Sequence, residues 1–203
     1  MRQRLIVFTR YPEPGKTKTR LIPVLGAEGA ATLQRQMTEH KLADVKKLQA
    51  VSKLSVEVHF AGGNEQLMQD WLGSSISYQQ QSEGDIGCRM ASAFEASFKA
   101  GMNHVVVIGT DCPDLNASLL VEAFQSLEQH DLVLGPAEDG GYYLIGLRRL
   151  IPELFTGISW STAEVLQQTQ SIAQKFGLAV AYLPRLNDVD RPEDLWVWKQ
   201  ANV

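Results

Sequence analysis

The chain has 203 residues, of which 44% are hydrophobic and 21% charged, a composition ordinary for a globular protein of one domain. Its formal net charge of −4 at pH 7 argues against the broad basic face that nucleic acids and anionic membranes require. Cys88 and Cys112 are too few for a disulfide framework or a thiolate metal site, so we expect both to be reduced core residues. We therefore expect neither a nucleic acid nor a membrane as partner, and any cationic site must be local.

The amino terminus reads MRQRLIVF, and its apolar run is too short for a secretion signal. No apolar stretch of about 18 residues, the length that would span a bilayer, follows in the sequence. This pattern predicts a cytoplasmic protein.

Short apolar runs recur along the chain and indicate strands. Residues 5–8 and 105–108 are nearly continuous apolar runs rich in branched side chains, as expected of strands buried on both faces of a parallel sheet. Further strand candidates are residues 56–60, 132–134, 142–145 and 179–183.

Helical patterns lie between these strands. Apolar residues recur every fourth position over residues 86–98, and again over residues 120–127 behind Asn116 as the predicted cap. The alternation of strands and helices predicts an α/β protein: a single three-layer α/β/α domain over residues 1–203, with a mostly parallel central sheet.

Two later helices show start signals. Ser161 and Glu164 have the spacing of a capping box, and Gly177 is a plausible end for the helix that follows. Asp190 and Glu193 repeat the spacing near the carboxyl terminus.

The loop after the first strand, TRYPEPGKTKTRL, concentrates the cations Lys16, Lys18 and Arg20. Ligands of parallel α/β sheets bind beyond the carboxyl ends of the strands, which favours a polyphosphate cradle here. The alternative is a solvated basic loop face. The loop lacks GxxxxGK[ST] and GxGxxG, so two large phosphate-binding classes are disfavoured.

Asp111 follows the buried run of residues 105–108 and is well placed to hold a divalent cation. Thr110 beside it is a candidate nucleotide contact. The alternative role, capping the next helix, suits Asp114 better than Asp111.

Asp188 and Asp190 are spaced to share one face of an extended segment, as a pair of metal ligands requires. Asp190 also fits the cap of the last helix, and the sequence does not choose which aspartate reaches the metal.

Two acids and two glycines, Glu138, Asp139, Gly140 and Gly141, follow residues 132–134. Either acid is a candidate general base or a ligand of acceptor hydroxyls, and the glycines would allow close approach of the backbone to a ligand. An ordinary hairpin turn explains the pattern equally well.

The helix that opens at Gly84 and Asp85 offers free backbone N–H groups to a nucleotide or phosphate. Trp160 is a candidate wall of an acceptor pocket, or a side chain that packs at a helix entry.

Six segments, taken in their order along the chain, resemble the nucleotide-diphospho-sugar transferase superfamily. They are FTRYPEPGKTKTRLIPVLG, EGDIGCRMASAF, VIGTDCPDL, GPAEDGGYYLIGL, ISWSTAEV and DVDRPEDL. The superfamily has the glycosyltransferase-A (GT-A), Rossmann-like fold, and the chain is most similar to its 2-phospholactate-guanylyltransferase-like (cofC-like) branch. The resemblance implies phosphate binding by Gly15, Lys16, Lys18 and Arg20, and metal binding by Asp111 with Asp188 or Asp190. The first loop departs from the commoner glycine-rich form, with Arg10 ahead of it as a further candidate nucleotide contact.

The resemblance implies a transferase that uses a nucleotide donor and Mg²⁺ or Mn²⁺, with Lys18, Arg20, Asp111 and either Glu138 or Asp139 in catalysis. Our leading hypothesis is glycosyl transfer from an NDP-sugar to a small acceptor. The alternatives are nucleotidyl transfer from an NTP to a phosphorylated small molecule and a non-catalytic nucleotide-binding regulatory module. A haloacid-type phosphatase is a weaker rival, because its aspartate pair belongs after the first strand. A homodimer is a candidate assembly.

Overall fold

The structure, a computed structural model, describes residues 1–201, so the last two residues of the predicted 1–203 domain lie outside the description. Its strands are β1 (Gln3–Arg10), β2 (Leu54–Ala61), β3 (Ser77–Gln80), β4 (His104–Ile108), β5 (Leu132–Pro136), β6 (Tyr142–Leu147) and β7 (Val180–Tyr182). Its helices are α1 (Ile22–Val51), α2 (Glu65–Leu72), α3 (Ile86–Lys99), α4 (Ala117–Ser126), α5 (Val165–Lys175) and α6 (Leu195–Ala201), with short 3-10 helices at Thr19–Leu21, Pro152–Phe155 and Pro192–Asp194.

The strands form one sheet of seven in the order β3-β2-β1-β4-β6-β5-β7. Four of the neighbouring pairs are parallel, and only β6 runs antiparallel to its neighbours β4 and β5. The mostly parallel sheet is confirmed. All six expected strands are present; the edge strand β3, with the polar sequence SYQQ, has no apolar run that would reveal it.

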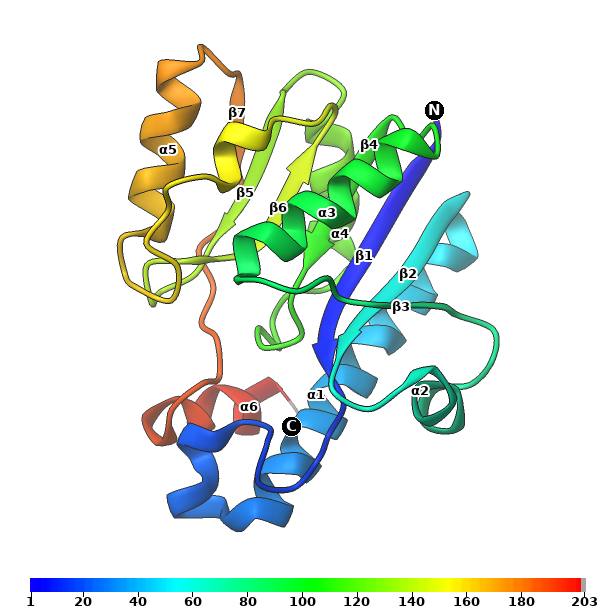
Figure 1. Cartoon of the computed structure of the whole chain (residues 1–203), viewed down its shortest axis with the longest axis vertical. Coiled ribbons are helices and arrows are strands. Elements are labelled where there is room, and N and C mark those ends of the chain that lie inside the picture. The colour runs from blue at the N-terminus through cyan, green and yellow to red at the C-terminus, as the bar shows by residue number, and fades with distance from the viewer. Residues whose placement is uncertain (202–203) are drawn as a thin grey trace.

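Helices cover both faces of the sheet, and Figure 1 shows α3 in front of it and α1 and α4 behind. The alternation of β1 side chains produces this layering. Leu5 and Val7 pack in one core cluster with residues of α1 and α4, whereas Ile6 and Phe8 pack in another with residues of α3 and α5. The three-layer α/β/α architecture is therefore confirmed.

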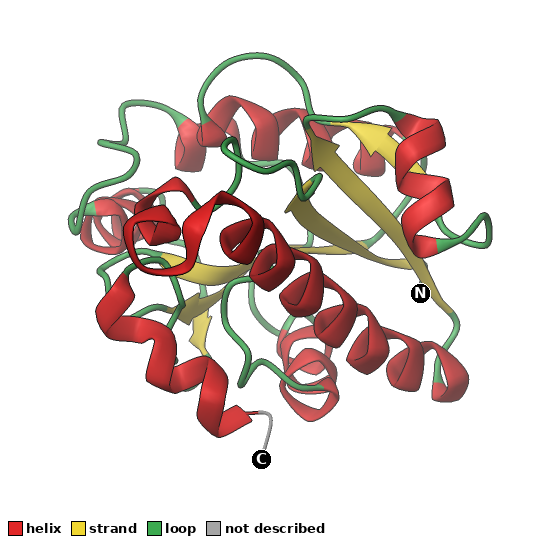
Figure 2. Cartoon of the chain, turned by 90° about the horizontal axis from the view of Figure 1, so that it is seen from below, coloured by secondary structure: helices red, strands yellow, loops and turns green. Residues whose placement is uncertain are grey.

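A third apolar cluster lies at the lower end of Figure 1. It joins Leu21 and Met37, at the start and middle of the α1 region, to Val189 and to Val197 of α6. Figure 2, seen from below, shows α6 beside the long helix α1. This packing fixes the segment after β7 against the loop after β1.

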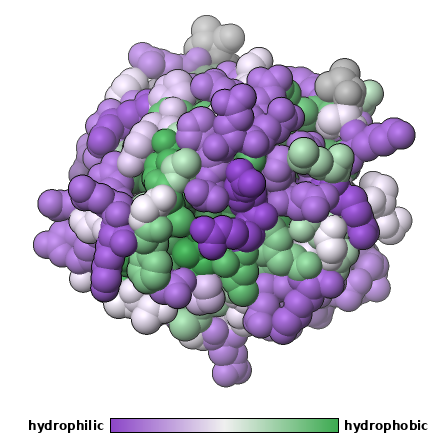
Figure 3. Space-filling model, turned by 90° about the horizontal axis from the view of Figure 1, so that it is seen from above, coloured by the Kyte–Doolittle hydropathy of each residue, from purple (hydrophilic) through white to green (hydrophobic). Residues whose placement is uncertain are grey.

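The parallel strands β1, β2 and β4 run downward in Figure 1, so their carboxyl ends meet in the lower half of the molecule. Figure 3 views the opposite end, where hydrophilic side chains surround a smaller hydrophobic area. Within residues 1–201 no helix has the length and hydrophobicity needed to cross a membrane.

Two helices begin at a capping side chain, and the predicted cap, Asn116, is confirmed. The side chain of Asn116 accepts hydrogen bonds from the backbone at the start of α4, and Asp85 Oδ1 accepts one from the N–H of Cys88 at 2.8 Å at the start of α3. Gly177, with φ +61°, follows the end of α5 as expected.

The predicted capping boxes of the two later helices are wrong. Glu164 is itself the N-cap residue of α5, and its side chain makes no capping hydrogen bond. Ser161 lies in the turn before α5 and has a left-handed backbone (φ 64°). Near the carboxyl terminus Asp194, not Glu193, accepts hydrogen bonds from the N–H groups of Asp190 and Arg191.

Candidate active site

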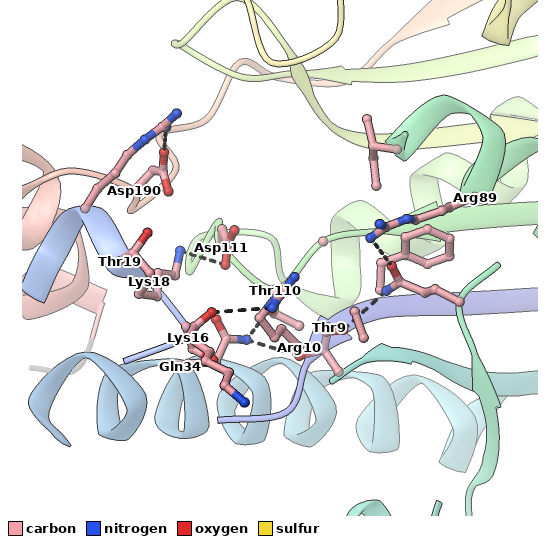
Figure 4. A pocket seen from close by; sticks show the side chains of 17 residues that line it. Thr9, Arg10, Lys16, Lys18, Thr19, Gln34, Arg89, Thr110, Asp111 and Asp190 are labelled. Atoms are coloured by element: carbon pink, nitrogen blue, oxygen red, sulfur yellow. Dashed lines mark hydrogen bonds and ion pairs between the residues drawn. The ribbon is translucent and has the colours of Figure 1, made fainter. Parts of the chain in front are cut away.

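A cavity of about 580 Å³ opens at the carboxyl ends of β1 and β4 (Figure 4). It is within the usual range for a pocket that holds a small molecule or cofactor. Its wall carries five Lys and Arg side chains and two carboxylates: Arg10, Lys16, Lys18, Arg20 and Arg89, with Asp111 and Asp190.

Lys18 pairs with Asp111 in this wall. It has a left-handed backbone (φ 49°, ψ 44°), which is uncommon for a residue with a side chain and turns the loop inward. Its Nζ lies 2.9 Å from Asp111 Oδ1 and also donates to the carbonyl oxygen of Val189. Because the Lys18 side chain is only 4% exposed, these partners are what stabilise its charge.

The same contact joins three distant segments of the chain. The N–H of Val189 donates to the carbonyl oxygen of Asp111 at 2.9 Å, so the loops after β1, β4 and β7 are tied together at one point. In Figure 4 the side chains of Lys18 and Asp111 point toward each other.

The other two predicted loop cations differ from Lys18. Arg20 forms an ion pair with Asp190 Oδ2, so Asp190 is engaged with a cation in the first cavity. Lys16 is 68% exposed, and its Nζ lies 2.7 Å from Glu13 Oε1. Arg10 donates to the carbonyl oxygen of Lys16 at 3.4 Å and lines the same cavity.

A buried polar network underlies the cavity. Gln34 Nε2, from α1, donates to the hydroxyls of Thr9 and Thr38 at 3.1 Å and lies 3.4 Å from the hydroxyl of Thr110. Thr9 and Thr38 also share a hydrogen bond of 2.8 Å. The network connects α1 to the ends of β1 and β4. Gln34 was not identified from the sequence, because a single polar residue among the buried positions of a helix does not by itself indicate a functional role.

The loop that carries Asp111 is supported from behind by Lys41, a second residue that sequence reasoning missed. Its side chain is fully buried, and Nζ donates to the carbonyl oxygens of Leu115 and, at 3.4 Å, Pro113. Burial lowers the pKa of Lys41 to about 8, although the negative charge of Asp44 acts in the opposite direction and raises it. An ammonium group buried under this loop holds its backbone in place.

A second, smaller cavity of about 230 Å³ adjoins the first. Both cavities include Ile86, Gly109 and Asp111 in their walls. The second is lined further by Met90, Cys112, Ala137, Asp139, Gly141, Tyr142, Tyr143, Trp160, Ser161, Thr162, Val165 and Asp188.

Asp188 faces this second cavity, unlike Asp190. Burial, followed by the negative charges of Asp139 and Asp111, raises the pKa of Asp188 to about 6. The charges of Asp139 and Asp111 therefore disfavour ionisation of Asp188 in the absence of a cation.

Asp111 and Asp188 fit a divalent cation by their chemistry. Mg²⁺ is usually held by one or two carboxylates together with phosphate oxygens. Within residues 1–201 no three His, Cys, Asp or Glu side chains group closely enough to hold an ion alone. An ion at this position would therefore depend on oxygens from a bound ligand.

The remaining predicted residues divide between the cavities and their surroundings. Asp139 and Gly141 line the second cavity, and the N–H of Gly141 donates to Asp139 Oδ1 at 2.8 Å within the turn from β5 to β6. Gly140, with φ +91°, packs against the backbone of Ala163. Glu138 is exposed, lies 3.9 Å from Arg185 and is outside both sets of lining residues.

Three predicted residues lie beside the first cavity rather than in its wall: Gly15, Gly84 and Asp85. The carbonyl oxygen of Gly84 accepts a hydrogen bond of 3.0 Å from Arg89 Nε, and Arg89 in turn lines the cavity together with Gln81. Sequence reasoning missed Arg89, because a charged residue on the polar face of a helix carries no signal of its own.

The fold is that of the nucleotide-diphospho-sugar transferases and cytidylyltransferases. A protein from Desulfovibrio desulfuricans G20, provisionally assigned as a nucleotide-diphospho-sugar transferase, superposes with a TM-score of 0.92 at 36% sequence identity, over 100% of this chain and 88% of that one. The inositol-1-phosphate CTP transferase from T. maritima superposes with a TM-score of 0.61 at 15% identity, over 100% and 95% of the two chains. The 4-diphosphocytidyl-2C-methyl-D-erythritol synthase from Anaerococcus prevotii DSM 20548 gives a TM-score of 0.66 at 10% identity, over 100% and 96%.

The family model described as "Uncharacterized protein conserved in bacteria (DUF2064)" matches residues 44–162, and the chain belongs to this family. These comparisons confirm the resemblance to the nucleotide-diphospho-sugar transferase superfamily. No curated protein matches the chain.

Proposed function

We propose that the protein is a metal-dependent transferase that binds the phosphates of a nucleotide donor in the first cavity. One observation carries the proposal: five cationic side chains converge with Asp111 at the carboxyl ends of β1 and β4. Cations in such a wall would offset phosphate charge in a chain whose overall charge is negative. The fold shared with nucleotide-using transferases supports the same reading.

The roles of the residues follow from their positions. Lys18, held rigidly and nearly buried, would stabilise charge on the donor phosphates, and Arg20 would add a second cation at the mouth of the cavity. Asp111 and Asp188 would hold Mg²⁺ or Mn²⁺, which when bound supplies positive charge to the phosphates. Asp139, at the second cavity, is better placed than Glu138 to accept a proton or a hydrogen bond from an acceptor hydroxyl.

Nucleotide binding is tested by thermal unfolding with NTPs and NDP-sugars, with and without Mg²⁺ or Mn²⁺. A ligand at one hundred times its Kd stabilises the folded state by about 2.7 kcal/mol. For a chain of this length this raises Tm by roughly 5–10 °C. If no nucleotide raises Tm, with or without metal, the proposal is wrong.

Asp111→Asn tests the metal role, and Asp114→Asn is the matched control, because Asp114 is exposed on the same loop and lies outside both sets of lining residues. We expect Asp111→Asn to abolish the metal-dependent part of the Tm increase and Asp114→Asn to retain it. An equal response of both variants would contradict a metal site at Asp111.

Turnover distinguishes the chemical alternatives. Release of NDP from an NDP-sugar indicates glycosyl transfer, and release of pyrophosphate from an NTP indicates nucleotidyl transfer. Metal-dependent nucleotide binding without either product, across a panel of acceptors, would favour the non-catalytic regulatory module.

A further inference from the structure

The ammonium group of Lys18 lies where the two segments that carry the candidate metal ligands meet. Its Nζ is 2.9 Å from Asp111 Oδ1 and donates to the carbonyl oxygen of Val189, the residue that follows Asp188. The N–H of Val189 in turn donates to the carbonyl oxygen of Asp111 at 2.9 Å. Lys18 therefore places a positive charge at the point where a divalent cation would also be held.

This charge acts on Asp111 with little screening by water. The Lys18 side chain is 4% exposed, whereas the Asp111 side chain is 47% exposed and can be reached from both cavities. The obstacle to a free cation at Asp111 is therefore electrostatic rather than steric. A divalent ion on this carboxylate would be repelled by the ammonium group already bound to it, and the repulsion is strong because Lys18 is buried.

The neighbouring aspartates offer a free cation little compensation. Asp190 is already paired with Arg20, as Figure 4 shows. Asp188 forms no ion pair within the described part of the chain, but it is a single carboxylate on the wall of the second cavity. A free ion would thus be left with Asp188 and with a carboxylate that Lys18 shares.

The phosphates of a donor change this balance. They supply further oxygen ligands for a metal and negative charge for the cations of the loop. Lys18 lines the first cavity, in which the proposed function places these phosphates. Its repulsion of the metal is then offset by its attraction for the phosphates.

We infer that Lys18 keeps free divalent cations away from Asp111 and Asp188, so that the metal enters together with the phosphates of the nucleotide. The inference rests on the proposed nucleotide and metal sites. The alternative is that a free cation binds weakly only because the chain offers too few ligands, and that Lys18 has no part in it.

The test is titration of the full chain with Mn²⁺ without nucleotide, followed by electron paramagnetic resonance of the unbound ion. Lys18→Met removes the charge, and Lys18→Gln removes it while keeping an N–H donor for the carbonyl oxygen of Val189. We expect each variant to bind Mn²⁺ about tenfold more tightly than the wild type. Both should bind metal-free nucleotide more weakly, so the effects on the two ligands have opposite signs.

Lys99→Met is the matched control. Lys99 Nζ lies 2.7 Å from Glu95 Oε1 at the end of α3, and neither residue lines a cavity of the site. This variant removes the same charge from another pair of lysine and carboxylate, and it should leave the Kd of Mn²⁺ unchanged.

The inference is overturned if both Lys18 variants bind Mn²⁺ no more tightly than the wild type, including no binding by any of the three, or if Lys99→Met tightens binding equally. These titrations contain no nucleotide, so they separate the two proposals. If nucleotides raise Tm while the Lys18 variants leave the Mn²⁺ affinity unchanged, this inference alone is wrong. If no nucleotide raises Tm, the proposed function is wrong.

Discussion

Lys18→Met tests whether the geometry of the loop after β1, rather than its number of charges, creates the nucleotide site. The Lys18 side chain is 4% exposed and its Nζ is fixed 2.9 Å from Asp111 Oδ1, whereas the Lys16 side chain is 68% exposed and pairs only with Glu13 among the ion pairs of the described chain. A hydrogen bond to a charged group contributes about 1.5–3 kcal/mol, which corresponds to roughly 10–150-fold in Kd. An exposed charge contributes about 0–1 kcal/mol, or less than about sixfold.

The assay is calorimetric titration of both variants with the nucleotide that gives the largest thermal shift. We expect Lys18→Met to weaken binding by the larger factor and Lys16→Met by the smaller one. Lys18→Met also leaves the carbonyl oxygen of Val189 without this donor, so Tm should fall by roughly 2–6 °C. Equal weakening by the two variants would refute the reasoning, because affinity would then follow charge alone.

Two further predictions concern stability. Burial lowers the pKa of Lys41 to about 8 from 10.5, so the unfolded chain binds this proton more tightly, and the contribution of Lys41 to stability grows as pH rises through 8 toward 10.5. The unfolding free energy of the wild type relative to Lys41→Met should therefore increase by about 1 kcal/mol between pH 8 and pH 9, measured by urea unfolding, and a flat difference would contradict this titration. Gly140→Ala should lower the unfolding free energy by more than about 1 kcal/mol, because φ is +91° and the new Cβ would lie 2.2 Å from the carbonyl oxygen of Ala163. Gly177→Ala, where φ is +61° and no atom lies within 4 Å of the added Cβ, separates backbone strain from the clash, and an equal loss in both variants would show that the clash adds nothing.

The sequence predicted most of the sheet because buried parallel strands need continuous apolar runs, and such runs are readable without a structure. The long helix α1 was not predicted: its early part contains Pro23, Gly26 and Gly29, and Gly26 has a non-helical backbone inside it. Local signals also failed where a neighbouring residue supplied the same hydrogen bond, as Asp194 does in place of Glu193.

The candidate site was predictable in part. A basic loop after the first strand and an aspartate after the fourth are visible in the sequence, since each follows an apolar run. Gln34 and Lys41 were not, because both lie within α1 and their partners lie in other parts of the chain. Thr9 of β1 is 25 residues from Gln34, and Leu115 is 74 residues from Lys41. Polar residues buried in a helix become meaningful only when their partners are known.

By itself the sequence determined the α/β class, six of the seven described strands and the positions of the cations and aspartates along the chain, because hydrophobic periodicity and loop chemistry are local properties. Only the tertiary structure decided which of these residues meet. It set Lys18 rather than Lys16 against Asp111, paired Asp190 with Arg20 and left Asp188 facing the second cavity. The physical reason is that strand order and the packing of α6 against α1 bring the three loops together, and these contacts join residues as much as 171 positions apart.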